Sequence, residues 1–327
     1  MRKLYAAITD TSDIATVDVD HDYSQPTANA VVKCSTTSLS LGDAIEIDIG
    51  YTDDHAVVFN GYVLEKITTR NAGELSYTLR CRDNLWRAMA MFIASEDPQA
   101  PLKYSNITAE SLVATMLDLS GISTHSLDSP GFTFAPEEPL EIQLTSAWDI
   151  INRVCWLIAW HCYDDMGTIR FLDRKPYNVA GDVSVHSFTV GDSGDILTIE
   201  PYAISSDKIR NKVVVYGKEG WVYASAQASS PFLPAGFYKA EVLSAPDLVD
   251  NNTMAQEIAD YNLDLMNRLE KSATVTVLGT PAVSARKVVT FTEAKTGISA
   301  DWFVYSCKHR LSDSYMTSMT LTQRQTS

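Results

Sequence analysis

Strict alternation of apolar and polar residues near the start is the feature that most constrains the fold of this chain. In the segment TVDVDHDY, Val17 and Val19 point to one side while Asp18, Asp20 and Asp22 point to the other. This alternation is typical of a β-strand with one buried face. The segments DAIEIDIGY, VVFNGYVLEKITTR and LSYTLRCRD continue the pattern. Residues 1–90 are therefore predicted to form short strands of a small barrel or sandwich.

Helical spacing of the apolar residues begins after this strand region. The segment TAESLVATMLDLSG offers Thr108 as an N-cap and Gly121 as a helix end. A second helix start is indicated by Ser146, which is followed three residues later by Asp149. The middle of the chain is therefore predicted to contain helices of ordinary globular length.

The stretch TSAWDIINRVCWLIAWHCYDDMGTIRFLDRK is predicted to be a helix followed by a β-hairpin. The helix is expected to end near Trp160, and the sequence DMG supplies the hairpin turn. Because four residues of the helix fall on one stripe, we expect them in the core. The stripe consists of Trp148, Ile151, Cys155 and Ile158.

The rest of the chain returns mostly to strands. A β region is predicted from Lys208, and one further helix is predicted in NTMAQEIADYNLDLMNRLEKS, where Thr253 and Gln256 form a capping box. Segments such as ATVTVLG, KVVTFTEA and DWFVYSCKHRL again read as strands. The predicted fold class is mainly β with α-helices, of the α+β type.

Size and charge limit the classes of function. The chain has 327 residues and a formal net charge of −15, which suggests about two or three domains and argues against a nucleic-acid-binding protein with a basic face. We find neither a signal peptide nor an apolar run of about 18 residues, so no membrane anchor is expected. The five scattered cysteines fit synthesis in a reducing cytoplasm better than a disulfide framework.

Two patterns could be taken for metal sites, and we favour a structural role for both. The run from Asp18 to Asp22 resembles the start of a calcium loop, but Tyr23 and Asn29 stand where such a loop needs glycine and glutamate. Cys155, His161 and Cys162 lack the spacing of a zinc site, and Cys155 falls on an apolar helix face. No metal and no cofactor are therefore predicted.

No catalytic motif supports an enzyme. The sequence lacks the nucleophile elbow, the paired histidines of zinc proteases and the phosphate-binding loop. With 41 acidic residues, any two carboxylates could be nominated as a glycosidase pair, so such a nomination carries little information. His309 lies near a strand end and is interpreted as structural. No catalytic residue is predicted.

The helix–hairpin stretch resembles a segment of phage tail hub proteins, the family of late control protein D, which also includes the N-terminal hub part of type VI secretion spike proteins. In this family a helix with an arginine between apolar residues precedes a hairpin. Along the hairpin follow, in order, a bulky residue, an aspartate, a glycine and a phenylalanine. The matching residues are Arg153, Trp160, Asp164, Gly167 and Phe171.

The C-terminal part carries a second portion of the same resemblance. Gly279, Pro281, His309 and Thr320 match the closing strands of the family, and GDAIEIDIGYTDDHAVVFNGYVLEKI resembles its first barrel. The family often has glycine where this chain has the segment Ala285-Arg286-Lys287. That departure concerns the shape of the loop around Arg286 and leaves the predicted fold unchanged.

The resemblance implies an architecture of two tail-tube-like β-barrels and a helix-containing domain. The expected ranges are 1–90 for the first barrel, 91–200 for the helix and hairpin domain, and 201–327 for the second barrel with its inserted helix. It further implies a late structural protein of the virion tail, assembled in the host cytoplasm as a homotrimer. The trimeric ring would join the six-fold tail tube to a three-fold tip and let DNA pass during ejection.

The implied partners are the tail tube or distal tail protein, the tape measure protein, and a tip, spike or central fibre protein, with no specific binding of the passing DNA. Asp18, Asp20 and Asp22 are candidates for the channel lining, because carboxylates repel phosphate. Two alternatives stay open: a hub or spike subunit of a secretion or contractile injection apparatus, and a tail-associated cell-wall hydrolase. Because the chain ends soon after the second barrel, any piercing needle is expected to be another protein.

Overall fold

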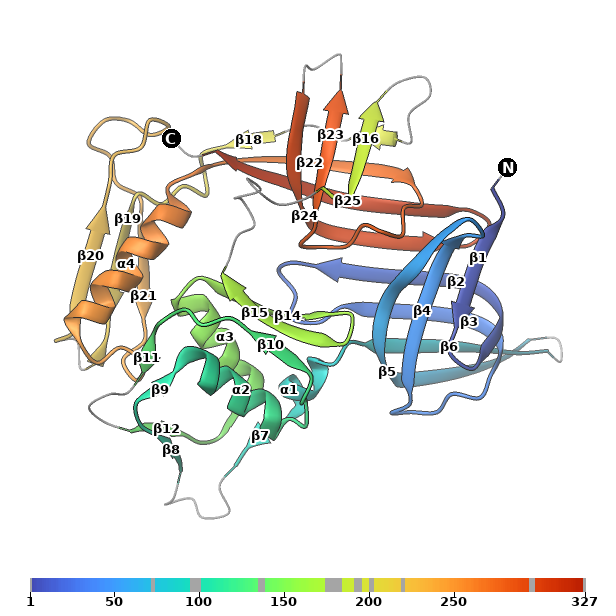
Figure 1. Cartoon of the computed structure of the whole chain (residues 1–327), viewed down its shortest axis with the longest axis horizontal. Coiled ribbons are helices and arrows are strands. Elements are labelled where there is room, and N and C mark those ends of the chain that lie inside the picture. The colour runs from blue at the N-terminus through green and yellow to red at the C-terminus, as the bar shows by residue number, and fades with distance from the viewer. Residues whose placement is uncertain are drawn as a thin grey trace.

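The computed structural model describes residues 2–71, 74–94, 101–134, 139–173, 184–190, 196–199, 203–218, 221–293 and 298–325. Strands predominate and four α-helices are present in these ranges, so the predicted mainly β fold with α-helices is confirmed. Figure 1 shows the strands from both ends of the chain side by side, with the helices packed on the other side of the molecule. None of the described helices is long and apolar enough to cross a membrane.

The N-terminal strands pair in a closed ring. They are β1 (Leu4–Ile8), β2 (Thr11–Asp22), β3 (Asn29–Thr37), β4 (Ala44–Tyr51), β5 (Asp54–Asn71) and β6 (Glu74–Arg82). The pairings run β1–β4–β5–β6–β3–β2, and a single pair between Ile8 and Thr11 returns to β1. The alternation in the sequence places Val17, Val19 and Ile47 in a fully buried core, as the period of two requires.

A second group of strands comes from distant parts of the sequence. It contains β16 (His186–Val190), β17 (Ile196–Ile199), β18 (Ala203–Ser205), β22 (Leu269–Leu278), β23 (Val288–Glu293), β24 (Ile298–Leu311) and β25 (Tyr315–Gln325). This group has its own buried cluster around Trp302, Phe188 and Phe291. The core therefore needs residues before and after the intervening helical segments.

One strand pairing joins the two groups into a 13-stranded sheet. β2 runs antiparallel to β24, with pairs from Val17–Leu311 to Asp22–Ser306. We call this β2–β24 pairing the seam. It brings residues near position 20 beside residues near position 308, so the first and last parts of the chain form one continuous surface.

The helical unit lies on the opposite side from this sheet (Figure 1). Its elements are α1 (Trp86–Ala90), β7 (Phe92–Ile93), β8 (Leu102–Tyr104), β9 (Ile107–Thr108), α2 (Ala109–Leu119), β10 (His125–Leu127), β11 (Thr133–Phe134), β12 (Leu140–Ile142), β13 (Thr145–Ser146), α3 (Ala147–Leu157), β14 (Trp160–Asp165) and β15 (Thr168–Asp173). Thr108 caps α2 and Ser146 caps α3 with Asp149 in a capping box, so both helix starts are confirmed. Gly121 adopts a φ of +70° after α2, as expected of a helix end.

A fourth group contains β19 (Lys212–Tyr216), β20 (Tyr223–Gln227), β21 (Ala240–Ser244) and α4 (Asn252–Met266). The predicted capping box of Thr253 and Gln256 is wrong, because the Asn251 side chain accepts the cap hydrogen bond from the Met254 N–H. α4 covers the three strands and also contacts the helical unit, since the Asn262 amide donates to the Leu157 carbonyl at 3.0 Å.

The buried clusters do not follow the ranges 1–90, 91–200 and 201–327 in simple order. β16 to β18 belong to the large sheet, whereas β19 to β21 and α4 share one apolar cluster with α2 and α3. Strand pairing between distant segments decides this grouping, and a sequence pattern does not contain it. The division into domains stays a prediction.

Two buried histidines lie within the seam, His21 on β2 and His309 on β24. The His21 Nε2–H donates to the Val58 carbonyl at 2.8 Å. The His309 Nε2 lies 2.8 Å from the Val283 carbonyl, and its Nδ1 lies 2.8 Å from the Tyr315 hydroxyl. Burial lowers the pKa of His21 to about 4 and that of His309 to about 3. His309 is therefore held neutral. Its two ring nitrogens connect β24 to Val283 and to Tyr315 on β25.

Acid should weaken the folded state through these histidines. The unfolded chain takes up a proton near the ordinary histidine pKa of 6.5, while folded His21 does so only near 4, so stability is full above pH 6.5 and falls as the pH drops toward 4. Between pH 7 and pH 5 the wild type should lose about 2 kcal/mol more unfolding free energy than His21→Gln, which keeps a donor but cannot titrate. Urea unfolding at the two pH values measures this difference, and equal losses in both proteins would contradict it.

Candidate functional site

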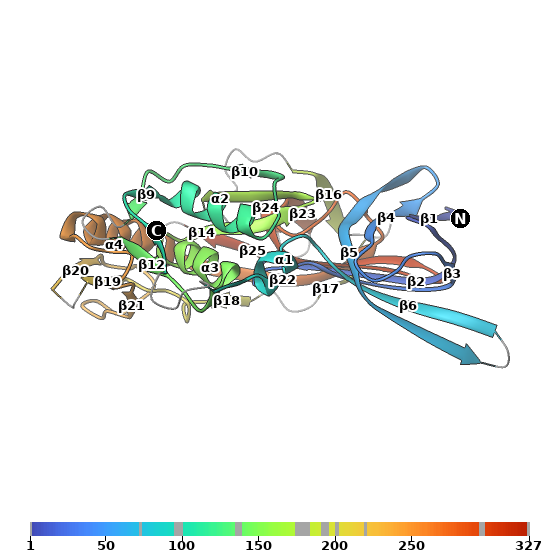
Figure 2. The ribbon, with the colours of Figure 1, turned by 90° about the horizontal axis from the view of Figure 1, so that it is seen from below.

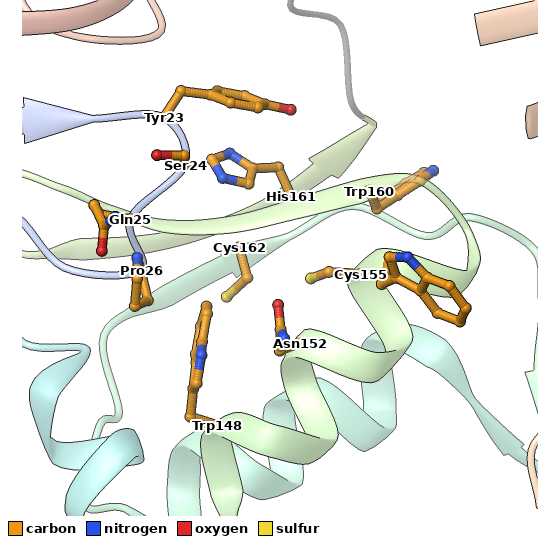
Figure 3. A pocket seen from close by; sticks show the side chains of 11 residues that line it. Tyr23, Ser24, Gln25, Pro26, Trp148, Asn152, Cys155, Trp160, His161 and Cys162 are labelled. Carbon is orange, nitrogen blue, oxygen red and sulfur yellow. The ribbon is translucent and has the colours of Figure 1, made fainter. Parts of the chain in front are cut away.

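A pocket of about 250 Å³ lies where the helix–hairpin stretch meets the loop after β2 (Figure 3). It is built from aromatic, polar and sulfur-containing side chains of three segments: the loop after β2, the helix α3 and the strand β14. The lining residues are Tyr23, Ser24, Gln25, Pro26, Trp148, Asn152, Cys155, Trp156, Trp160, His161 and Cys162.

Two residues of the predicted core stripe of α3, Trp148 and Cys155, line this pocket, and all four lie in or against the apolar cluster. Ile151, Cys155 and Ile158 are buried, whereas Trp148 is only partly buried and stands on the pocket wall. The helix ends at Leu157, three residues before the predicted end, because Ala159 adopts a left-handed φ of 53° that stops the helix. Trp160 is instead the first residue of β14.

The other predicted helix–hairpin residues hold this unit in shape. The Arg153 guanidinium forms an ion pair with Asp247, in the segment before α4. Gly167 adopts a φ of +93° in the hairpin turn, a conformation that glycine takes at little cost. Phe171 is fully buried, and its ring centroid lies 4.9 Å from that of Trp160.

Arg286 connects the large sheet to this unit at the edge of the pocket. Its guanidinium lies 4.4 Å from the centroid of the Tyr163 ring and 5.8 Å from that of Tyr23. The Arg286 Nε–H donates to His161 Nδ1 at 3.3 Å, and the His161 ring stacks on Tyr23 with centroids 4.3 Å apart. One side chain therefore ties the loop after β2, the hairpin and the loop before β23 together. We call this set the Arg286 junction.

Two buried carboxylates fix the backbone beneath the junction. Asp83 accepts hydrogen bonds from the Ala28 N–H at 2.5 Å and the Leu85 N–H at 3.1 Å. Asp164 accepts from Asn84 and Gly167 N–H groups at 2.9 and 2.6 Å. Burial raises the pKa of both carboxyl groups. Each carboxylate accepts hydrogen bonds from two backbone N–H groups. Neither is among the residues lining the pocket, so their raised pKa values do not place an acid in contact with a pocket ligand.

The Cys162 thiol of the pocket has an environment typical of a structural cysteine. Burial raises the pKa of the Cys162 thiol well above its ordinary value, which disfavours the thiolate that binds metals. Within the described residues no group of three or more histidine, cysteine or acidic side chains could hold a metal ion. The pocket is therefore suited to packing and to polar contacts.

The three aspartates predicted for the channel lie on the outward face of β2. Each stands opposite a residue of β24: Asp18 faces Arg310, Asp20 faces Lys308 and Asp22 faces Ser306. Arg310 Nε lies 3.8 Å from Asp18 Oδ1. Asp22 also accepts hydrogen bonds from the Ser24 N–H and hydroxyl, both at 2.7 Å. Two of the three aspartates of β2 thus stand opposite cations of β24, and the third stands opposite a serine.

The central residue of the junction, Arg286, was missing from the sequence prediction. Its signal was present, because the segment Ala285-Arg286-Lys287 departs from the glycine that the resembling family often has there. Arg286 has a φ of +74°, a left-handed conformation that costs a non-glycine residue about 1 kcal/mol or more. Strand pairing, which brings position 286 beside position 23, was needed to reveal its role.

The family model described as YQBQ-like matches residues 19–322. The chain belongs to the YQBQ-like family. No curated protein matches its sequence.

Solved structures of tail proteins share the fold of this YQBQ-like chain over nearly its full length. A tail protein from Neisseria meningitidis has a TM-score of 0.70 at 15% identity, covering 98% of this chain and 97% of that protein. A 43 kDa prophage tail protein from Shewanella oneidensis has a TM-score of 0.68 at 12% identity, covering 99% and 98%. A type VI secretion system component from E. coli gives 0.53 at 11% identity, covering 99% and 77%. The predicted resemblance to tail hub and secretion spike proteins is confirmed at the level of fold.

Removing the Arg286 side chain should weaken the junction. Arg286→Ala loses the two ring contacts and the hydrogen bonds to His161 and to the Asp22 carbonyl while keeping the left-handed backbone, so it should lower the unfolding free energy by about 2 kcal/mol. Arg286→Gly relieves the backbone conformation and should be about 1 kcal/mol more stable than Arg286→Ala. Denaturant titration of the three proteins tests this order, and an Ala variant as stable as the wild type would refute it.

Truncations along α3 should follow burial rather than side-chain size. Ile151→Ala empties a fully buried site and should cost roughly 2–5 kcal/mol. Trp148→Ala should cost about 2 kcal/mol, less than for a fully buried tryptophan, because one side of the ring meets the pocket. Trp156→Ala is the matched control, because 40% of Trp156 is exposed; its effect should stay within about 1 kcal/mol. Thermal unfolding would contradict this reading if Trp156→Ala were the most damaging change.

Proposed function

We propose that this chain is a structural hub protein at the distal end of a phage tail. In this role three copies form a ring that joins the six-fold tail tube to a three-fold tip or spike and lets DNA pass during ejection. The likeness to whole tail proteins is the observation that carries the proposal, because the chain covers 97% and 98% of the two tail proteins described above. Similarity over a full chain supports a shared overall role more strongly than similarity of one small domain.

The arrangement of strands supports the ring. The closed pairings of the first six strands and the second group around β22 to β25 are two tube-like barrels in this proposal. Three subunits with two barrels each present six barrels, which matches a six-fold tube while keeping three-fold symmetry toward the tip. The seam fixes the two barrels of one chain relative to each other. A ring in which six barrels are evenly spaced requires this fixed arrangement.

The proposed partners follow from this position in the tail. One end of the ring contacts the tail tube or distal tail protein, and the other contacts a tip, spike or central fibre protein. The tape measure protein occupies or approaches the bore before ejection. The site of action is the virion tail.

DNA passage in this proposal depends on a wall that does not retain phosphate. The outward face across the seam carries Asp18 and Asp20 beside Arg310 and Lys308, and Arg310 lies 3.8 Å from Asp18, so each of these cations has an anion beside it. Paired cations release fewer counterions on contact with DNA, which lowers non-specific affinity. We propose this face, with Asp22, as part of the channel lining.

A hub subunit of a secretion or contractile injection apparatus is the second candidate. It is favoured by the fold shared with the E. coli type VI secretion component, of which this chain covers 77%. The protein's own location separates the two candidates. Antibody labelling of purified virions should mark the tail tip if the chain is a phage hub, and a particle without DNA should carry the label if it is a secretion component.

The proposed trimer has a definite mass. Three copies of the 36.1 kDa chain give 3 × 36.1, or about 108 kDa. Light scattering over a range of protein concentrations should approach this value, and the ring should be visible at the tail end in virions. A protein that stays monomeric at high concentration, with no ring in the virion, would remove the support for a trimeric hub.

A further inference from the structure

One side of α3 carries two tryptophans with an amide side chain between them. Trp148, Asn152 and Trp156 are spaced four residues apart, so they lie on the same side of the helix. α3 lies beside α2 in both views of the ribbon (Figure 1 and Figure 2), and its buried residues belong to the apolar cluster shared with α2. Asn152 and Trp156 are nevertheless exposed. Because a tryptophan gains much free energy from burial, these three residues are a candidate ligand contact.

The same three residues form part of the wall of the pocket of about 250 Å³ described above. Figure 3 shows Trp148 and Asn152 on one side of the pocket, and Tyr23 and His161 on the opposite side. Gln25 contributes a second amide to the lining. Pockets for drug-sized ligands measure roughly 300–1,000 Å³, so this smaller pocket is suited to a single small ring.

The chemistry of the lining favours a neutral ligand. Among the described residues that line the pocket, none is an aspartate, glutamate, lysine or arginine. His161 Nδ1 accepts a hydrogen bond from Arg286, so Nδ1 carries no proton and the ring is neutral. A cation on the pocket rings would meet the like charge of Arg286, which lies 5.8 Å from the Tyr23 ring centroid. An anion would lose its hydration without gaining a cation in the lining.

We propose that this pocket binds a neutral sugar ring of an oligosaccharide. The C–H groups of a sugar ring form an apolar face that packs on an aromatic ring, and Trp148 supplies that surface. The hydroxyl groups at the rim of the sugar both donate and accept hydrogen bonds, as do the side-chain amides of Asn152 and Gln25. The next ring of the sugar chain lies on the exposed Trp156. Apolar surface with a few polar groups is typical of small-molecule sites.

The pocket binds the sugar without cleaving it. Hydrolysis of a glycosidic bond commonly uses two carboxyl groups beside the bond, and the described lining contains none. The nearby carboxylates of Asp83 and Asp164 accept backbone hydrogen bonds instead. This inference goes beyond the hub role. It does not depend on the proposed trimer, because every residue in the lining belongs to one chain.

A proline-rich peptide is the main competing ligand, because such peptides dock in aromatic-lined grooves. Proline has no backbone N–H, so the peptide would offer only carbonyl acceptors to Asn152 and Gln25. The oxygens of these two amides would then gain no donor from the ligand. Sugar hydroxyls can pair with both the N–H and the oxygen of each amide, and for this reason we favour the sugar.

Titration with chitotriose, a neutral trimer of N-acetylglucosamine, tests the binding. NMR signals of the indole N–H groups report on the six tryptophans, and single Trp→Phe substitutions assign them. The signals of Trp148 and Trp156 should shift with a dissociation constant on the order of 1 mM, as expected for one or two bound rings. Trp221 is 84% exposed and does not line the pocket, so its signal should stay in place.

Two other compounds test the class of ligand. Hexaproline represents a proline-rich peptide, and tetramethylammonium represents a cation that binds aromatic rings. Each is titrated under the same conditions and should bind about tenfold more weakly than chitotriose, or not at all.

Substitutions on α3 separate binding from folding. Trp156→Ala should weaken chitotriose binding about tenfold, whereas Trp156→Tyr keeps an aromatic face and should stay within about threefold of the wild type. Asn152→Ala should weaken binding about fivefold, because it removes a hydrogen-bonding amide. Trp221→Ala is the matched control and should bind as the wild type does. Circular dichroism should show an unchanged fold in all four variants, since the three positions are exposed.

Chitotriose shifts at Trp148 and Trp156 that are weakened in Trp156→Ala, with Trp221→Ala unaffected, support the sugar site. The absence of any shift at about twenty times the expected dissociation constant overturns it, as does full affinity in both Trp156→Ala and Asn152→Ala. Tighter binding of hexaproline or tetramethylammonium at the same signals also overturns it, because the pocket would then bind a peptide or a cation. None of these results changes the hub proposal, which depends on the mass and the location of the assembly.

Discussion

The antiparallel pairing of β2 with β24 is the interaction on which the rest of the structure depends. It joins residues that are almost the whole chain apart, so its closure entropy must be offset by the two cores that it aligns. Val17, Val19 and His21 face inward and meet Leu311, His309 and Cys307 across the seam. The same register places Asp18 and Asp20 opposite Arg310 and Lys308 on the outer face. Core packing and surface charge therefore both favour one alignment, and a slip of one residue would lose both.

The position of the helical unit follows from the seam. Once β2 and β24 are paired, the loop after β2 and the loop before β23 lie together, and Arg286 reaches Tyr23, His161 and Tyr163. Buried Asp83 and Asp164 then fix the chain between the sheet and the hairpin through backbone N–H groups. The pocket is a product of this junction. In the proposed hub, these connections would hold the helical unit in place relative to the large sheet.

Local physics made much of the fold predictable. The alternation of β2 and the caps at Thr108 and Ser146 depend on neighbours within a few residues, and they appear where the sequence placed them. Two details failed for equally local reasons: Ala159 stops α3 early by adopting a left-handed conformation, and Asn251 outcompetes Thr253 as the cap of α4. Asparagine and threonine can both cap a helix, and several residues near Trp160 could end α3. Which of the neighbouring candidates is used depends on how the chain enters and leaves each helix.

By itself the sequence determined the strands, the helices, the acidic balance and the resemblance to tail hub proteins, because periodicity, capping and motif order are properties of short segments. Tertiary structure alone decided that β16 to β18 join the large sheet, that α4 packs with the helical unit, and that Arg286 is central to the junction. It also decided that Asp18 and Asp20 of β2 lie beside Arg310 and Lys308 of β24. These features arise from pairings between distant segments. The alternation of residues along a segment predicts which face a side chain takes, but it does not predict which strand will lie beside it.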